Sequence, residues 1–201
     1  MDDDASVRKA LARLLGSAGY RTETFASAEE LLVRSDLESV SCILADVQMP
    51  GLNGLELQHA LRAVDRQLPI VFITGHGDIP MSVRAMKAGA VDFITKPFED
   101  VELLKAVALA LGKSRAEQNE RIETAAIRRR LSTLTPRERE VLWHVLGGQL
   151  NKQAAVDLGV VEKTIKVHRA RIMKKMGARS LAELVRMAVR IDYLRAESSA
   201  S

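Results

Sequence analysis

Short apolar runs alternate with segments of helical periodicity over the first half of the chain. The strand-like runs, bounded by turn formers, are VSCILAD, LPIVFIT and VDFIT. The helix-like segments are ASVRKALARLLGSAG, LELQHALRAVD, DIPMSVRAMKAGA and KPFEDVELLKAVALALG, and an extended YRTETF follows the first of them. A capping box at Ser27 and Glu30 starts a further helix. Strands that alternate with helices predict a parallel, doubly wound α/β sheet.

The second half of the chain has helical patterns only. In TPREREVLWHVLGG, Thr135 is the expected N-cap, Pro136 the first helical residue and Glu138 the partner of a capping box. Three more helices are predicted in NKQAAVDLG, VEKTIKVHRARIMKKMG and SLAELVRMAVRI. Only Gly159-Val160-Val161 separates the second helix from the third, which is the short turn of a helix-turn-helix.

Charge divides the chain in the same way. Residues 1–112 carry 11 Lys and Arg against 16 Asp and Glu, whereas residues 113–201 carry 19 against 10. This asymmetry predicts an acidic module joined to a module that binds a polyanion. The connecting KSRAEQNERIETAAIRRRL, residues 113–131, is highly charged with few apolar positions. It is predicted to be a solvated helical linker, with a dimerising helix as the alternative.

The composition excludes several classes of protein for this chain. Cys42 is the single cysteine, which excludes an internal disulfide framework and a multi-cysteine metal site. It lies in the apolar VSCILA and is expected to be a small core residue. The sequence contains no run of about 20 apolar residues, which is the length that a membrane-spanning helix needs. Its acidic start is unlike the basic start of a signal peptide. We therefore expect a cytoplasmic protein without membrane contacts.

Acidic residues follow the predicted strands. Asp46 ends VSCILAD, and Asp2 and Asp3 precede the first helix. The carboxyl ends of parallel strands meet at one edge, so these carboxylates are expected to converge there around a hard cation such as Mg²⁺. Thr74, which ends the next strand, and Lys96, which follows the one after, add a hydroxyl and an ammonium. These groups could hold the oxygens of an acyl phosphate.

The motifs together resemble a known family. The initial DDD, ILADVQMP, FITGHGD and FITKPF resemble the receiver domain of two-component response regulators, and the basic C-terminal part resembles the LuxR-type helix-turn-helix. The whole chain is thus similar to NarL/FixJ-family response regulators. The resemblance implies a flavodoxin-like receiver in residues 1–112, the helical linker in 113–131 and an all-α, four-helix DNA-binding domain in 132–197.

The resemblance assigns roles around the acidic residues. It implies that Asp46 is the phosphate acceptor and that Asp2 and Asp3 bind Mg²⁺ with it. The backbone carbonyl of Gln48 would complete the magnesium site. His76 in TGHGD is expected to be a loop residue with local hydrogen bonds rather than a base.

Three further assignments concern the response to phosphate. Thr74 would bind the phosphoryl group and Lys96 would pair with it. Phe93 matches the aromatic position whose ring turns inward when Thr74 moves, although plain core packing is the alternative reading of a ring in a strand. The family also implies a cis peptide bond between Lys96 and Pro97.

The third C-terminal helix has the pattern of a recognition helix. Ile165, Ile172 and Met176 recur on a face that should pack inward. The opposite face carries Lys163, Lys166, Val167, Ala170 and Lys174. The resemblance makes Lys166, Val167 and Ala170 base readers, and it makes phosphate contacts of Lys152, Thr164, His168, Arg169 and Arg171. A merely solvated basic helix is the alternative.

The chain departs from the family at its start. Receivers of this kind begin with a central strand that delivers the acidic pair, but here only Met1 precedes Asp2. Our hypothesis is that a GTG valine codon was read as the initiator, so that roughly seven upstream residues, one strand, are missing. The other possibility is a real truncation, which would give a regulator that no longer switches properly.

These expectations combine into one function. We expect a DNA-binding transcriptional regulator, not an enzyme, that a partner sensor histidine kinase phosphorylates on Asp46. The active form would be a homodimer on promoter DNA, with RNA polymerase as a further partner. Two alternatives are a constitutive DNA-binding regulator with a truncated receiver and a phosphoaspartate-forming phosphatase. The latter chemistry needs an acid at the position of Gln48.

Overall fold

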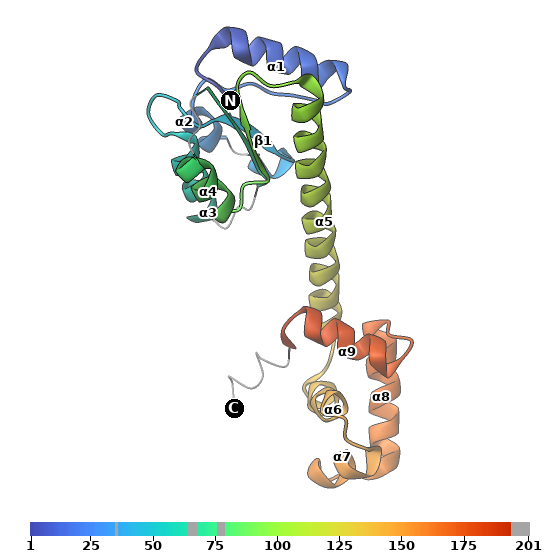
Figure 1. Cartoon of the computed structure of the whole chain (residues 1–201). Helices are drawn as coiled ribbons and strands as arrows, with labels where there is room; N and C mark the ends of the chain where they lie inside the picture. The colour runs from blue at the N-terminus through green and yellow to red at the C-terminus, as the bar shows by residue number, and fades with distance from the viewer. Residues whose placement is uncertain (35, 64–67, 76–78, 194–201) are drawn as a thin grey trace. The chain divides into compact units, whose positions relative to one another are not determined.

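The computed structural model describes residues 1–34, 36–63, 68–75 and 79–193. These residues form two compact units, divided between residues 118 and 119, which are described separately below (Figure 1). None of the described helices is long and apolar enough to cross a membrane.

A parallel sheet forms the centre of the first unit. Its described strands are β1 (Ile43–Asp46), β2 (Ile70–Thr74) and β3 (Asp92–Thr95), in the order β1-β2-β3. Every residue of β2 is buried, as the continuous apolar run LPIVFIT predicts for a central parallel strand. The register pairs Asp46 with Ile73 and Thr74 with Thr95, so that the strands end side by side.

Helices cover both faces of this sheet, as a doubly wound fold requires (Figure 1). The elements are α1 (Ala5–Ser17), α2 (Ala28–Leu32), the 3₁₀ turn η1 (Leu37–Ser39), α3 (Gly54–Ala63), α4 (Ile79–Lys87) and the first part of α5 (Asp100–Ser132). On one face, Leu31 and Leu57 from α2 and α3 pack around Phe72. On the other face, Leu11 and Leu103 from α1 and α5 pack against the sheet, and half-buried Cys42 joins this cluster.

Met1 lies beside β1. The backbone N–H of Asp46 donates to the carbonyl of Met1 at 2.9 Å, and the Met1 ammonium donates to the carbonyl of Leu44 at 2.6 Å. Met1 thus makes two main-chain hydrogen bonds with β1. Residues 21–25, within the segment YRTETF that was expected to be extended, are assigned to no helix or strand.

The second unit is built from helices only. After the end of α5 come α6 (Pro136–Leu146), α7 (Asn151–Asp157), α8 (Glu162–Met176) and α9 (Leu181–Arg190). The capping box of Thr135 and Glu138 forms as predicted. Ile165, Ile172 and Met176 of α8 are buried in the common core, which confirms the predicted inward face. Ile127 of α5 is buried in the same core, so this part of the expected solvated linker is packed.

Candidate functional site

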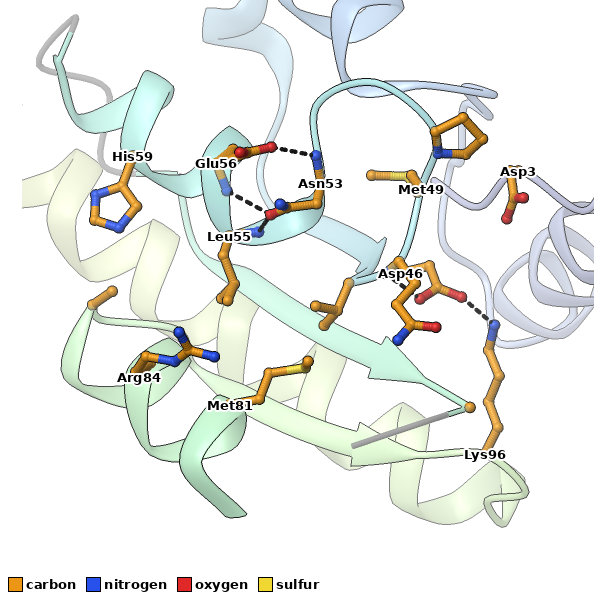
Figure 2. Close-up of a pocket in the computed structure, with 15 residues that line it drawn as sticks. Asp3, Asp46, Met49, Asn53, Leu55, Glu56, His59, Met81, Arg84 and Lys96 are labelled. Carbon is orange, nitrogen blue, oxygen red and sulfur yellow. Dashed lines mark hydrogen bonds and ion pairs between the residues drawn. The ribbon is translucent and has the colours of Figure 1, made fainter. Parts of the chain in front are cut away.

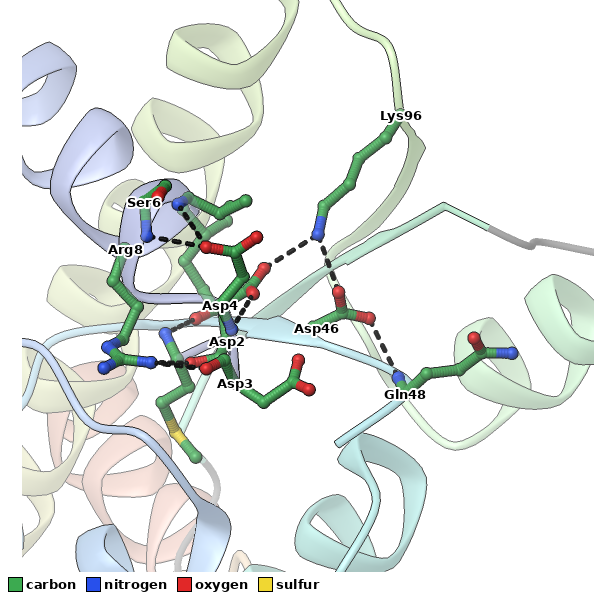
Figure 3. Close-up of polar contacts among 11 residues, drawn as sticks. Asp2, Asp3, Asp4, Ser6, Arg8, Asp46, Gln48 and Lys96 are labelled. Carbon is green, nitrogen blue, oxygen red and sulfur yellow. Dashed lines mark hydrogen bonds and ion pairs between the residues drawn. The ribbon is translucent and has the colours of Figure 1, made fainter. Parts of the chain in front are cut away.

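Asp46 lies at the carboxyl end of β1 with both carboxylate oxygens engaged. Oδ1 accepts a hydrogen bond from the backbone N–H of Gln48 at 2.8 Å, and Oδ2 accepts one from Nζ of Lys96 at 2.6 Å (Figure 3). The residue is 7% exposed. The largely buried apolar run of β1 thus ends in a charged side chain that is held in a fixed direction.

Lys96 joins Asp46 to a second acid. Its ammonium also donates to Oδ2 of Asp2 at 2.7 Å, and Asp2 is buried (Figure 3). Partial burial disfavours the charge on Lys96, but the hydrogen bonds to Asp2 and Asp46 outweigh this effect and raise the pKa of the ammonium above its ordinary value. The predicted convergence of Asp2, Asp46 and Lys96 at the sheet edge is therefore what the structure shows.

The next two acids have different positions. Asp3 is exposed and lines the pocket beside Asp46. Asp4, which the sequence pattern grouped with the other two, is the N-cap of α1, and its carboxylate accepts from the backbone N–H of Ser6 at 2.6 Å. This cap lowers the pKa of Asp4, because the N–H groups of Ser6 and Val7 stabilise the carboxylate. Asp4 therefore serves the helix and not the cluster.

Arg8 is a contributor that sequence reasoning missed. Its guanidinium, one turn into α1, donates to the backbone carbonyls of Asp2 at 2.7 Å and Asp3 at 3.0 Å (Figure 3). These contacts hold the backbone from which both acidic side chains project. A cation six residues after the first acid, on the helix that follows, is the signal that could have indicated it.

A pocket begins at Asp46 and Lys96 and extends to His59 of α3 and Arg84 of α4 (Figure 2). Asn53 starts α3 beside it, where its side-chain oxygen accepts from the backbone N–H groups of Leu55 and Glu56, each at 3.0 Å. The carboxylate of Asp46 therefore forms part of the wall of this pocket.

Gly54 sets how closely α3 approaches the end of β1. A Cβ at this position would lie 2.7 Å from the carbonyl oxygen of Asp46 and 2.9 Å from the ring of Phe72. No side chain fits there without movement of the backbone that carries Asp46. This constraint was also missed from the sequence.

The residues predicted to respond to phosphate lie on β2 and β3. Thr74 is fully buried at the end of β2, and its carbonyl accepts from the backbone N–H of Lys96 at 2.7 Å. The half-buried ring of Phe93 packs against that of Phe72 with centroids 6.4 Å apart, so its core-packing role is observed. The peptide bond between Lys96 and Pro97 is cis, as the resemblance implied. His76 lies outside the described residues.

The predicted magnesium cluster is assembled only in part. Among the described residues, no group of three or more His, Cys, Asp or Glu side chains is placed to hold a metal ion. The Lys96 ammonium lies between Asp2 and Asp46 instead, which compensates the repulsion between two carboxylates. The donors nevertheless fit Mg²⁺ chemically, because Asp3 and Asp46 offer carboxylate oxygens to the same pocket.

The predicted base readers lie on the exposed side of α8. Lys166, Val167 and Ala170 are exposed, and so are Arg171 and the α7 residue Lys152 among the predicted phosphate contacts. The other three predicted phosphate contacts are half-buried: Thr164, His168 and Arg169.

Two of the half-buried side chains have distinct surroundings. Nη1 of Arg169 donates to Oδ1 of Asn151 at 2.9 Å, which ties α8 to the start of α7. Nδ1 of His168 is buried without a hydrogen-bond partner among the described residues. The exposed readers are thus presented by a helix that Arg169 ties to α7.

The far end of α8 is attached to the preceding helices. Nζ of Lys175 contacts Oε2 of Glu138 at 2.6 Å and the carbonyl of Thr133 at 3.0 Å. The guanidinium of Arg130 in α5 donates to the carbonyl of Met176 at 3.1 Å. Glu138 is 3% exposed, and its contacts with Lys175 and the Thr135 N–H hold the pKa of its carboxyl below the ordinary value. None of these contacts was predicted.

Comparison with known proteins supports the assignment of both units. The family description "response regulator receiver domain" matches residues 1–108, and "bacterial regulatory proteins, LuxR family" matches residues 132–188. Nodulation protein W of Bradyrhizobium diazoefficiens is 47% identical over 187 residues, which are 93% of this chain and 82% of that protein.

Solved structures agree with this result. The response regulator StyR is 46% identical with a TM-score of 0.83, and the match covers 94% of this chain and 96% of that one. The structure FixJ-N is 42% identical with a TM-score of 0.53, over 56% of this chain and 90% of that one. These likenesses confirm a flavodoxin-like receiver followed by a helical domain. The chain belongs to the two-component response regulators, DNA-binding transcriptional regulators that are not enzymes, with a receiver domain and a LuxR-type DNA-binding domain.

Proposed function

We propose that Asp46 accepts a phosphoryl group from a sensor histidine kinase and that this modification controls promoter binding by α8. The observation that carries the proposal is the placement of the Asp46 carboxylate, which lines an accessible pocket and is aligned by Lys96 and the Gln48 N–H. Lys96 supplies positive charge at the point where the incoming phosphate oxygens would accumulate negative charge.

The transfer would proceed by attack of an Asp46 carboxylate oxygen on the phosphorus of a phosphohistidine. An O–P bond forms, the N–P bond breaks, and the imidazole leaves with the electron pair of that bond. Receiver domains of this kind bind Mg²⁺ for phosphorylation. In this chain, Asp2, Asp3, Asp46 and the carbonyl of Gln48 would hold the ion, which neutralises phosphate charge when bound.

The acyl phosphate would change the contacts of Lys96. It adds close to two negative charges beside an ammonium that Asp2 and Asp46 now share. Thr74 would follow the phosphoryl group, and Phe93 would turn with it. The response would therefore begin at the ends of β2 and β3.

On the DNA side, Lys166, Val167 and Ala170 would read base edges. The proposed phosphate contacts are Lys152, Thr164, His168, Arg169 and Arg171. The active species would be a cytoplasmic homodimer that contacts RNA polymerase, with residues 1–112 as receiver, 113–131 as linker and 132–197 as DNA-binding domain.

Intact-mass measurement tests the proposal. The full chain is incubated with Mg²⁺ and a small phosphodonor, with Asp46→Ala as the control. We expect wild type, and not the variant, to gain the mass of one phosphoryl group and then to bind promoter DNA more tightly. A chain that binds DNA equally well without any mass gain would support the constitutive alternative and contradict the proposal.

A further inference from the structure

One exposed face of α8 carries a single acidic residue among basic residues. Residues four apart along the helix are Glu162, Lys166, Ala170 and Lys174, and all four are exposed. Glu162 is the one acidic residue of α8, which otherwise contains six Lys and Arg. The row coincides with the proposed base-reading face, so the carboxylate lies where the helix would meet DNA.

Glu162 is in contact with one of the proposed readers. Its Oε1 lies 2.9 Å from Nζ of Lys166, one turn further along α8. The side chains are 45% and 63% exposed, so the ion pair is a surface pair and contributes little to holding the fold together. The contact does, however, restrict where the flexible lysine places its ammonium.

An acid in this position is unfavourable for DNA binding unless it makes a specific contact. A carboxylate near the phosphates of DNA is repelled and weakens binding to every sequence. At the floor of the major groove, however, a carboxylate accepts a hydrogen bond from the N4 amino group of cytosine. Opposite guanine or thymine it would instead face acceptor oxygens.

We propose that Glu162 is a specificity-determining residue that accepts from a cytosine amino group and directs Lys166 to a neighbouring guanine. The proposal rests on the proposed entry of α8 into the major groove. It assigns a preference for cytosine at one position of each half-site, next to the base pair that Lys166 reads. A good contact of this kind discriminates against other bases by roughly 10-fold.

Glu162 also has a structural alternative that the test must separate. It occupies the first turn of α8, where an acid favours the helix dipole, and the N-cap Val161 makes no side-chain cap. A residue that only stabilises the helix would change the melting temperature when replaced and would leave base preference unchanged.

The experiment is selection of bound duplexes from a random-sequence pool by the full chain, followed by sequencing. The variants are Glu162→Ala, Glu162→Gln and Glu140→Ala, the last as a control that removes an exposed, ion-paired acid from α6. We expect Glu162→Ala to lose roughly 10-fold preference for cytosine at one position and to bind random DNA more tightly. Glu162→Gln should shift that position toward adenine, which glutamine recognises. Glu140→Ala should keep the wild-type preference.

Lys166→Ala distinguishes failure of this inference from failure of the proposed function. If Lys166→Ala relaxes base preference while both Glu162 variants keep the wild-type preference, α8 reads DNA and the role of Glu162 is wrong. If Lys166→Ala also leaves every preference unchanged, the groove assignment fails and the inference fails with it.

Discussion

Two lysine–carboxylate contacts, one in each unit, have nearly the same geometry and opposite surroundings. Lys96 contacts Asp46 and Lys175 contacts Glu138, both at 2.6 Å, and the two acids are 7% and 3% exposed. Burial and distance therefore do not distinguish them. What differs is the charge around each pair, because Lys96 is shared with Asp2, whereas Lys175 shares its ammonium with a neutral carbonyl.

This difference indicates what each contact is suited to do. Asp2, Asp46 and the exposed Asp3 carry three negative charges against the positive charges of Lys96 and Arg8, so one negative charge is in excess. Such a cluster attracts a cation and can exchange partners. Glu138 and Lys175 neutralise each other, and the capping box uses the same carboxylate. We infer that the Lys96–Asp46 contact can rearrange, whereas the Lys175–Glu138 contact persists.

The largest expected effect is on the phosphorylation rate of a Lys96→Met chain. Loss of the ammonium removes the group that offsets charge on the incoming phosphoryl oxygens, so we expect the rate with a small phosphodonor to fall roughly 10- to 100-fold. The rate is measured by intact mass against time. Lys175→Met is the matched control and should keep the wild-type rate; an equal fall in both variants would contradict the comparison.

The second prediction concerns stability of the C-terminal unit. Lys175→Met leaves the buried Glu138 carboxylate without its charged donor, and we expect its free energy of unfolding to fall by about 2 kcal/mol. Denaturant unfolding, followed by fluorescence of Trp143 in this unit, measures the change. Lys174→Met, which alters an exposed neighbour, should change stability much less. Equal losses in the two variants would contradict a specific contribution of the Glu138 contact.

The smallest effect is a pH dependence. The contacts with Lys175 and the Thr135 N–H lower the pKa of Glu138 in the folded state. Its stabilising contribution is therefore present above the unfolded pKa and is lost as pH falls from about 4.5 through the lower folded value. Unfolding measured over this range should show a steeper loss for wild type than for Glu138→Gln. Parallel curves would indicate that the folded and unfolded pKa values do not differ.

The sequence predicted those features that depend on local pattern and on topology. Apolar runs located the strands, and the parallel arrangement brought Asp2, Asp46 and Lys96 to one edge. The capping box at Thr135 needs only neighbouring residues and was also predicted correctly. The roles of the individual site residues in phosphorylation and DNA reading stay predictions.

The features that were missed depend on contacts between distant or rotated segments. The Glu138–Lys175 pair joins residues that are 37 apart in the sequence, and no helical or strand periodicity predicts such a contact. The contacts of Arg8 depend on how α1 begins, which the cap at Asp4 determines. Ile127 lies in the segment predicted to be a solvated linker, but it is buried against residues of later helices.

The half-buried thiol of Cys42, just ahead of β1, gives the protein a built-in chemical reporter. Burial raises the pKa of this thiol, which keeps it from forming the reactive thiolate. A thiol reagent should therefore modify the folded receiver slowly and an opened receiver quickly. Because no other cysteine is present, the modification rate reports the opening of this region in the unaltered chain. Its change on phosphorylation would show whether the signal loosens or tightens the sheet behind Asp46.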